Sequence, residues 1–391
     1  MKKLLAGFFV VVLLFAATVS GSVGEDSQPE AKSLSLSQAI ELALKENHQI
    51  ELAGIGVEKA KLAVDQAESA AKKANNQIGN EIPNAAGGTS TIRKDQNLAM
   101  VIDVLPKQAQ SGKVIADTAL SYTENSIKFG VEAAYYGVQQ AEKLLEVSQA
   151  SFKRAEEQYK QAQARFNAGT SAKMEVISAE AQLKSAEAGV NEAQSTLQVA
   201  MMNLNKTLGL NLETPLKLTD SFQFKTAEAV DVEKVIQEMT DQDISFVSAR
   251  EEFNINQLNF DYHEKYYTSN TFVYRDAQYK YKEAEVKYDN AKVDLRLNIK
   301  GAYLDLKTAE ENYHVLTKSL EQAKEAYRLN KLRYEVGMAT NYEVLNGEAA
   351  LKQAELGLLN ALYNYNLAKA KFAYGIFPGS SSAGGASAPG M

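Results

Sequence analysis

Few of the side chains that carry out chemistry occur in this sequence in a suitable spacing. The 391 residues contain no cysteine and three histidines, His48, His263 and His314. Without cysteine there are no disulfides and no thiolate metal ligands. The histidines stand singly in stretches with helical periodicity, where an exposed helix residue is the commoner role. Because phosphate loops, HExxH motifs and nucleophile elbows are also missing, the sequence predicts no enzyme, no catalytic residues, no cofactor and no metal.

The charge balance and the first residues indicate the compartment. The formal net charge is −7, and an acidic chain is a poor candidate for binding nucleic acid. Lys2 and Lys3 precede the apolar run Leu4–Ala17 and then small residues, which is typical of a secretory signal peptide. We assign it to residues 1–24, with cleavage after Gly21 or Gly24. A retained anchor is the alternative, but the run is shorter than the ~20 residues that a spanning helix needs.

A block of 25 residues occurs twice. Arg165–Gly189 reads RFNAGTSAKMEVISAEAQLKSAEAG, and Arg333–Gly357, 168 residues later, reads RYEVGMATNYEVLNGEAALKQAELG, with eleven identical positions. Each copy predicts the end of a long helix, a turn at Gly169 or Gly337, and a second helix that folds back. Two copies imply a duplication, so the architecture must use both in equivalent places.

Helical periodicity and breakers divide the chain into two similar halves. The first, 25–214, has helices at about 37–76, 115–167 and 171–208. The second, 231–377, has helices at about 231–265, 276–335 and 341–375. A linker at 215–230 joins them, and a disordered tail covers 378–391. Within the breaker-rich stretch 76–114, only Leu98–Leu105 (LAMVIDVL) predicts a strand.

The helices are rich in Ala, Gln, Glu and Lys and have narrow apolar stripes, as in coiled coils. Such helices cannot build a thick core from one chain. They form either a slender bundle or an assembly in which several chains share their helices.

Four pieces of the sequence resemble the TolC family of outer-membrane efflux proteins. They are SLSQAIELALKENHQIELA, RFNAGTSAKMEVISAEAQL, MMNLNKTLGL and RYEVGMATNYEVLNGEAAL, in the family's order and with its duplication. The resemblance implies a homotrimer whose long helices form a hollow barrel, with two pairs of β-strands per protomer in the outer membrane. It also implies an inner-membrane pump and a periplasmic adaptor as partners, in efflux or type I secretion.

The sequence departs from the family where the strands belong. A transmembrane strand needs about 9–11 residues of alternating polarity, but the first segment offers only Leu98–Leu105, and Tyr266–Arg275 is too short for two strands. We therefore expect a mostly α fold of antiparallel coiled-coil helices in two tandem repeats, with the β-barrel part reduced or absent. The tyrosines of Tyr262–Tyr288 either lie at a membrane interface or pack between helices.

The resemblance places a ring of carboxylates near the turns. Glu343 falls where the family's second repeat supplies the main carboxylate, and Asn346 occupies the next ring position. Glu175 is the equivalent of Glu343 in the first repeat, and Tyr334 stands where the family bonds a tyrosine to an acidic residue of the neighbouring hairpin. Three copies of Glu343 would favour cations. Alternatively, Glu343 completes a capping box with Thr340 and only holds the start of its own helix.

The two turns match the family's contact with the adaptor. They are Ala168-Gly169-Thr170 and Val336-Gly337-Met338. Helix termination alone also explains both glycines.

The sequence thus predicts a trimeric envelope conduit of the TolC type that exports small molecules or peptides passively. It would lie at the outer membrane and periplasm, membrane-associated, with a pump and an adaptor as partners. The main alternative is a non-conducting coiled-coil spacer of the cell envelope. An adaptor-type protein would need a strand-rich domain, and the sequence has none.

Overall fold

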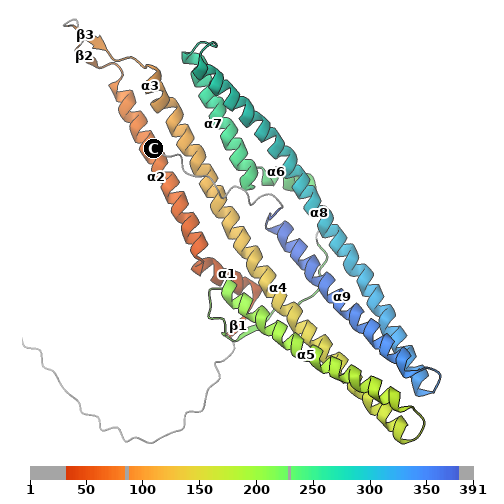
Figure 1. Cartoon of the computed structure of the whole chain (residues 1–391). Helices are drawn as coiled ribbons and strands as arrows, with labels where there is room; N and C mark the ends of the chain where they lie inside the picture. The colour runs from red at the N-terminus through yellow and green to blue at the C-terminus, as the bar shows by residue number, and fades with distance from the viewer. Residues whose placement is uncertain (1–31, 84–87, 228–229, 378–391) are drawn as a thin grey trace, which may run out of the picture.

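Two very long helices run through the molecule. The computed structural model describes residues 32–83, 88–227 and 230–377, so the predicted signal peptide and tail lie outside the described residues. Helix α4 has 63 residues (Leu105–Asn167) and α8 has 64 (Phe272–Glu335). At about 1.5 Å per residue each is roughly 95 Å long. They give the molecule its elongated shape (Figure 1).

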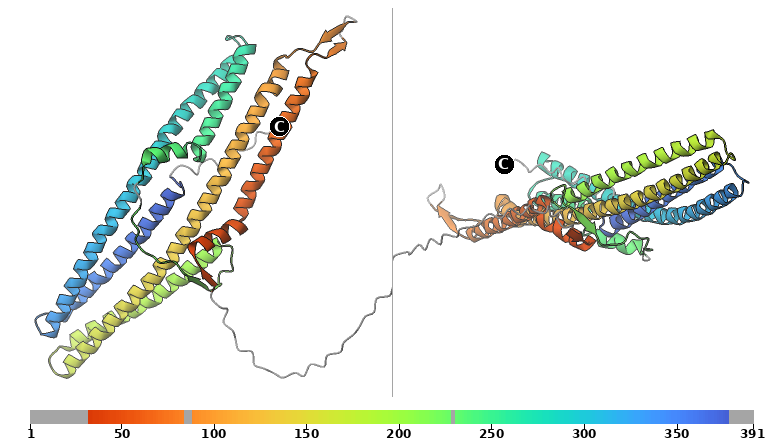
Figure 2. Two further views of the ribbon diagram at one scale, coloured as in Figure 1. Left: turned by 180° about the vertical axis from the view of Figure 1, so that it is seen from behind. Right: turned by 90° about the horizontal axis from the view of Figure 1, so that it is seen from below.

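The two halves share one plan. In the first half, α2 packs beside the upper part of α4 and α5 beside its lower part; in the second half, α7 and α9 do the same for α8 (Figure 1, Figure 2). A short helix precedes α2 in the first half, and another precedes α7 in the second half. The bounds are α1 (Leu36–Glu46), α2 (His48–Gln77), α5 (Lys173–Thr207), α6 (Val232–Met239), α7 (Ile244–Tyr266) and α9 (Asn341–Ala373).

Local capping signals in the sequence set several helix starts. Ser35 and Gln38 have the spacing of a capping box in the sequence, and they form this box at the start of α1. The predicted box at Thr340 is also present, and Glu343 completes it. In both cases a hydroxyl and a longer polar side chain satisfy backbone N–H groups that have no partner within the helix.

The prediction of a strand at Leu98–Leu105 is wrong. This stretch is helical, forming α3 (Gln96–Ala99), the π-helix η1 (Met100–Val104) and the start of α4. Asp95 caps it by accepting a hydrogen bond from Leu98 N at 2.9 Å. Pro106 follows the π-helix in the first turn of α4, where a residue without an N–H is tolerated. The apolar run therefore forms a buried helix face, with Ala99 and Val104 inside.

Other helix boundaries also differ from expectation. The helix expected at 37–76 is broken at Asn47, whose side chain caps α2. The helix expected at 231–265 is broken between α6 and α7, and Asp243 caps α7 through Phe246 N at 2.8 Å. Helices α4 and α8 begin at Leu105 and Phe272, earlier than the expected 115 and 276. Asn and Asp side chains bond to nearby backbone and so break helices that hydrophobic periodicity alone would continue.

The expected shortage of strands is confirmed in the described residues, where each strand has three residues. Strands β2 (Glu81–Pro83) and β3 (Thr89–Thr91) form an antiparallel hairpin beyond α2. Strands β1 (Lys32–Leu34) and β4 (Leu216–Leu218) pair in parallel beside α1. None of the described helices is both long and apolar enough to cross a membrane.

Aromatic rings join α7 to α8. Phe253 stacks on Tyr288 with ring centroids 5.2 Å apart, and Phe260 stacks on Tyr281 at 5.5 Å. Several tyrosines of Tyr262–Tyr288 thus pack between helices, although Tyr279 remains exposed.

The buried core is small and lies near the middle of the molecule. In the first half Tyr135, Val131 and Leu204 belong to one cluster between α1, α4 and α5. In the second half Ile299, Phe246 and Phe377 belong to a separate cluster. The lower hairpins extend beyond both clusters and depend on thin helix-to-helix contacts.

Candidate functional site

The two glycine turns lie next to each other at the lower end of the molecule (Figure 1). Gly169 and Gly337 have φ of +73° and +75°, the left-handed region that favours glycine. Thr170 N donates to Arg165 O at 2.9 Å, and Met338 N donates to Arg333 O at 2.7 Å. Both turns therefore end their helices in the same way.

The six turn residues predicted to contact an adaptor are all exposed. In the second turn, Val336 and Met338 are large apolar side chains that are exposed. Ala168 and Thr170 are exposed in the first turn, on either side of Gly169. Both turns offer a free surface at one end of the molecule.

Arg165 joins the two hairpins just above the turns. Its guanidinium lies 4.1 Å from the centre of the Tyr334 ring. It also donates hydrogen bonds to Tyr334 O at 2.7 Å and to Glu335 O at 3.1 Å. These carbonyls end α8, where a cation is favoured by the helix dipole.

The structure brings Tyr334 and Glu175 together without a hydrogen bond of normal geometry between them. Tyr334 is buried, and its hydroxyl has no hydrogen-bond partner among the described residues. Burial raises the pKa of Tyr334; the Arg165 charge opposes this, and the nearby Glu175 carboxylate adds to it. Glu175 is half-buried, and its carbonyl accepts a bond from Asn341 Nδ2 at 3.3 Å. A small shift of Glu175 would satisfy the buried hydroxyl.

Glu343 lies at the start of α9, where its contacts are those of a cap. Its Oε2 accepts from Thr340 N at 2.7 Å and from the Thr340 hydroxyl at 3.0 Å. The Thr340 N–H and hydroxyl hold the pKa of Glu343 below its usual range. The carboxylate therefore stays ionised at neutral pH. Asn346 is exposed one turn further along α9.

A buried polar network above these residues escaped the sequence reasoning. Glu348 on α9 accepts from Ser151 Oγ at 2.6 Å and from Gln182 Nε2 at 3.3 Å, so it joins α4, α5 and α9. Arg154 on α4 lies 3.5 Å from Glu348 Oε1 and 3.1 Å from Glu355 Oε2. The Glu348 side chain is 4 % exposed. Glutamate occupies this position in both copies of the repeated block, which could have indicated its role. A glutamate in a Glu-rich helix is, however, usually predicted to be exposed to solvent.

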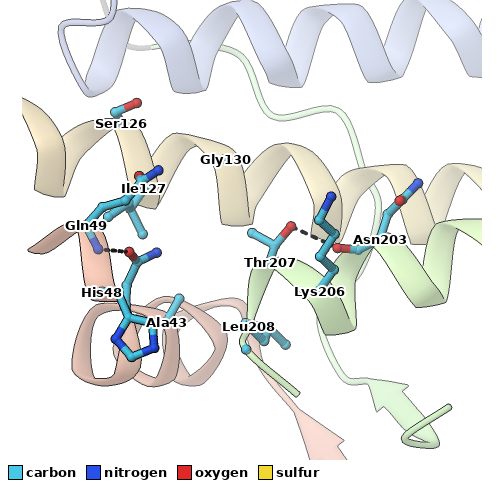
Figure 3. A pocket seen from close by; sticks show the side chains of 12 residues that line it. Ala43, His48, Gln49, Ser126, Ile127, Gly130, Asn203, Lys206, Thr207 and Leu208 are labelled. Atoms are coloured by element: carbon cyan, nitrogen blue, oxygen red, sulfur yellow. Dashed lines mark hydrogen bonds between the residues drawn. The ribbon is translucent and has the colours of Figure 1, made fainter. Parts of the chain in front are cut away.

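An open cavity of about 610 Å³ lies where α1, α2, α4 and the end of α5 meet (Figure 3). Two of its polar side chains bond within their own elements. Thr207 Oγ1 donates to Asn203 O at 2.8 Å, and Asn47 Oδ1 accepts from Gln49 N at 2.8 Å. The described part of the chain also contains no cluster of three or more His, Asp or Glu side chains that could hold a metal.

Comparisons with known proteins agree with this architecture. A family model described as outer membrane efflux protein matches residues 107–210 and 268–373, which hold most of the α4–α5 and α8–α9 hairpins. No curated protein matches the sequence.

Solved structures of outer-membrane proteins share the fold. The CmeC outer membrane channel of Campylobacter jejuni is 16 % identical, with 87 % of this chain and 85 % of that chain covered and a TM-score of 0.63. VceC of Vibrio cholerae is 14 % identical, with 86 % and 94 % covered and a TM-score of 0.65. The open state of the Neisseria gonorrhoeae MtrE channel is 16 % identical, with 87 % and 88 % covered and a TM-score of 0.62. At these identities the likeness concerns the fold.

Proposed function

Because this chain belongs to the outer membrane efflux protein family, we propose that it is the outer conduit of an efflux system. Small molecules or peptides pass through it passively, and it performs no reaction. After export by its signal peptide, it lies in the outer membrane and the periplasmic envelope.

Three copies assemble around a hollow axis, an inner-membrane pump supplies the energy, and a periplasmic adaptor docks at the turns. One observation carries this proposal: two copies of one hairpin lie side by side with their turns at the same end (Figure 1). They are joined on one side by the Arg165 and Glu348 contacts. Slender helices with one covered side gain their remaining packing from identical neighbours.

The narrowest part of the conduit lies near the turns, where Glu343 supplies a ring of three carboxylates. Its lowered pKa keeps that ring charged at neutral pH, and a charged ring favours cations. Opening is an outward shift of the hairpins. The contact between Arg165 and Tyr334 must loosen in that shift, and Glu175 is placed to bond the Tyr334 hydroxyl in one of the two states.

Conductance measurements test this function directly. The purified mature chain, added to planar lipid bilayers from detergent, is expected to give stepwise conductance. A strain without the gene is expected to become drug-sensitive and to recover when the gene is restored. A chain that stays monomeric and gives no conductance would instead support the coiled-coil spacer, which the three-residue strands favour.

A further inference from the structure

The turn between α7 and α8 forms one of two tips at the upper end of the molecule, opposite the glycine turns (Figure 1). Phe272 begins α8 in this turn and is 87 % exposed, more than any other large apolar side chain of the described residues. The next residue, Val273, is 45 % exposed. Two neighbouring exposed apolar side chains at the end of a long molecule form a surface that suits a partner.

This tip is rich in aromatic residues. The nine residues Tyr266–Tyr274 (YYTSNTFVY) contain four aromatic residues and no charged residue. The lower turns, 166–172 (FNAGTSA) and 336–342 (VGMATNY), are also uncharged but contain one aromatic residue each. Because tyrosine is enriched at the boundary between water and lipid, this difference favours the upper end as the place of a lipid contact.

Contacts with α7 hold the tyrosines of the tip in place. The ring centroids of Tyr266 and Tyr262 lie 5.0 Å apart, and Tyr274 meets Phe260 edge to face at 5.4 Å. Tyr266 and Tyr274 are half-buried. Such a ring, with an apolar body against the protein and a polar hydroxyl outside, suits the headgroup layer of a membrane.

The polar side chains of the tip bond to one another. Thr268 Oγ1 donates to Asn270 Oδ1 at 2.7 Å, and Thr271 Oγ1 donates to Thr268 O at 2.8 Å. Thr271 Oγ1 also accepts from Tyr274 N at 3.3 Å and so caps α8. A hydroxyl that already has a partner costs less to remove from water, so this tip can leave water more easily than an open polar turn.

Charged side chains limit how deeply the tip can enter lipid. Lys265 and Arg275 flank it, and both are exposed. Arg275 follows Phe272 by three residues, which is about 4.5 Å along a helix. Glu264 and Asp276, the neighbours of these two cations, balance their charge. The tip can therefore enter the interfacial layer by about one helical turn, and it has little preference for anionic lipid.

The hairpin of β2 and β3 forms the second tip of this end (Figure 1). Ile82 in β2 is 48 % exposed, and residues 88–92 carry no charge. The backbone at the base of the hairpin is paired, because Gly79 N donates to Ile92 O and Ile92 N donates to Asn80 O, both at 2.9 Å. Paired backbone groups lower the cost of leaving water here as well.

We propose that the two upper tips form a shallow seat in one leaflet of a lipid bilayer. Phe272, Val273 and Ile82 lie at the boundary between headgroups and acyl chains, and Lys265 and Arg275 remain in water. The contact depends on apolar area, because the charges beside the α7–α8 tip cancel. It rests on the proposed function for the presence of a membrane, but it does not depend on conduction.

Tryptophan fluorescence tests the seat because the natural chain contains no tryptophan. The mature chain carrying Phe272→Trp is purified in detergent and transferred to phosphatidylcholine vesicles by removing the detergent. We expect its emission to shift to shorter wavelength. Lipids brominated near the headgroup should quench it more than lipids brominated near the end of the acyl chain. Adding phosphatidylglycerol or salt should change neither result.

The matched control places tryptophan at the opposite end. Met338 is an apolar side chain that is 72 % exposed, and Met338→Trp is expected to show neither the shift nor the quenching. A second pair of variants measures binding. Phe272→Asp should release most of the chain from vesicles in a flotation experiment, whereas Met338→Asp should leave flotation unchanged. Circular dichroism checks that both variants keep their helices.

Equal flotation of the two Asp variants, or no quenching of Phe272→Trp, would overturn the proposal. If the wild-type chain still conducts in that case, the conduit stands and only this seat is wrong. The expected quenching in a chain that does not conduct would support the seat and count against the conduit.

Discussion

The α4–α5 hairpin and the α8–α9 hairpin repeat one sequence block, yet their equivalent residues have different surroundings. Glu348 is buried among partners from three helices, whereas Glu180 is exposed. Tyr334 is buried beneath Arg165, whereas Phe166 is exposed. A residue's burial here depends on which helix the chain places against it, because the local sequence is nearly the same.

The middle of the molecule differs in the same direction. Ala43 in α1 lines the open cavity of Figure 3. The equivalent residue, four positions before the α7 cap, is Met239, which packs beside Gly375 and the second core cluster. Near the turns the second hairpin is thus the better covered, and in the middle the second half is also the better filled.

The largest expected effect is at Arg154. Replacing it by Met leaves Glu348 and Glu355 without their cation in a mostly buried site. Removing one partner of a buried ion pair costs about 3–5 kcal/mol, and we expect a loss near the lower limit because Arg154 keeps some exposure. Urea unfolding followed by circular dichroism measures it.

The matched control is Gln322→Met at the equivalent position of α8, which is exposed. In the single chain this change is expected to alter the free energy of unfolding by less than about 0.5 kcal/mol. Similar losses from the two substitutions would mean that the Arg154 network does not distinguish the two hairpins.

Replacing the turn glycine should lower the stability by the same amount in the two copies. Gly169→Ala and Gly337→Ala each force a Cβ into the left-handed region, at a cost of about 1 kcal/mol. No atom lies within 4 Å of either new Cβ, so strain rather than a clash sets this cost. Thermal unfolding of the single variants measures it.

The double variant also tests the docking of the adaptor. If the turns contact an adaptor, cells carrying both substitutions should lose drug resistance although the protein is still present at normal amounts. Normal resistance in these cells would count against that contact.

Glu343→Gln separates the two roles of Glu343. Glutamine can still complete the capping box, so the helix start should persist while the negative ring is lost. We expect weaker cation selectivity in single-channel recordings, and a smaller change for Glu175→Gln. Unchanged selectivity for Glu343→Gln would leave only the capping role.

Lowering the pH tests the charge of the Glu343 ring without a mutation. A carboxylate with a lowered pKa keeps its charge above that pKa and loses it as the pH falls through it. Because the pKa of Glu343 is lowered, cation selectivity should persist through mildly acidic pH and decline only at a pH below the usual range for glutamate.

The smallest expected effect is at Gly130, beside the open cavity. A Cβ there meets no atom within 4 Å, so Gly130→Ala should stabilise α4 by about 0.5–1 kcal/mol. At Gly347 the new Cβ would lie 3.1 Å from Asn330 Nδ2, and the same gain should disappear. Thermal unfolding compares the two. A gain of equal size at Gly347 would show that the second half is not the more tightly filled.

Features that depend on a few neighbouring residues could be predicted from the sequence. The repeated block, the two glycine turns and the capping boxes at Ser35 and Thr340 could all be predicted. The turns and the capping boxes depend on backbone groups within one helical turn. The inter-helix segments, which are too short or lack alternating polarity, likewise predicted the shortage of strands.

Features that depend on distant segments became visible only in the folded chain. The run Leu98–Leu105 has an apolar composition that suits either a strand or a buried helix, and packing as a helix face settled it. Glu348 is buried because α4 and α5 bring Ser151, Arg154 and Gln182 to it. Glu180 has a similar local sequence but is exposed. Burial depends on the path of the whole chain. Of two nearly identical blocks, one is therefore covered at this position and the other is exposed.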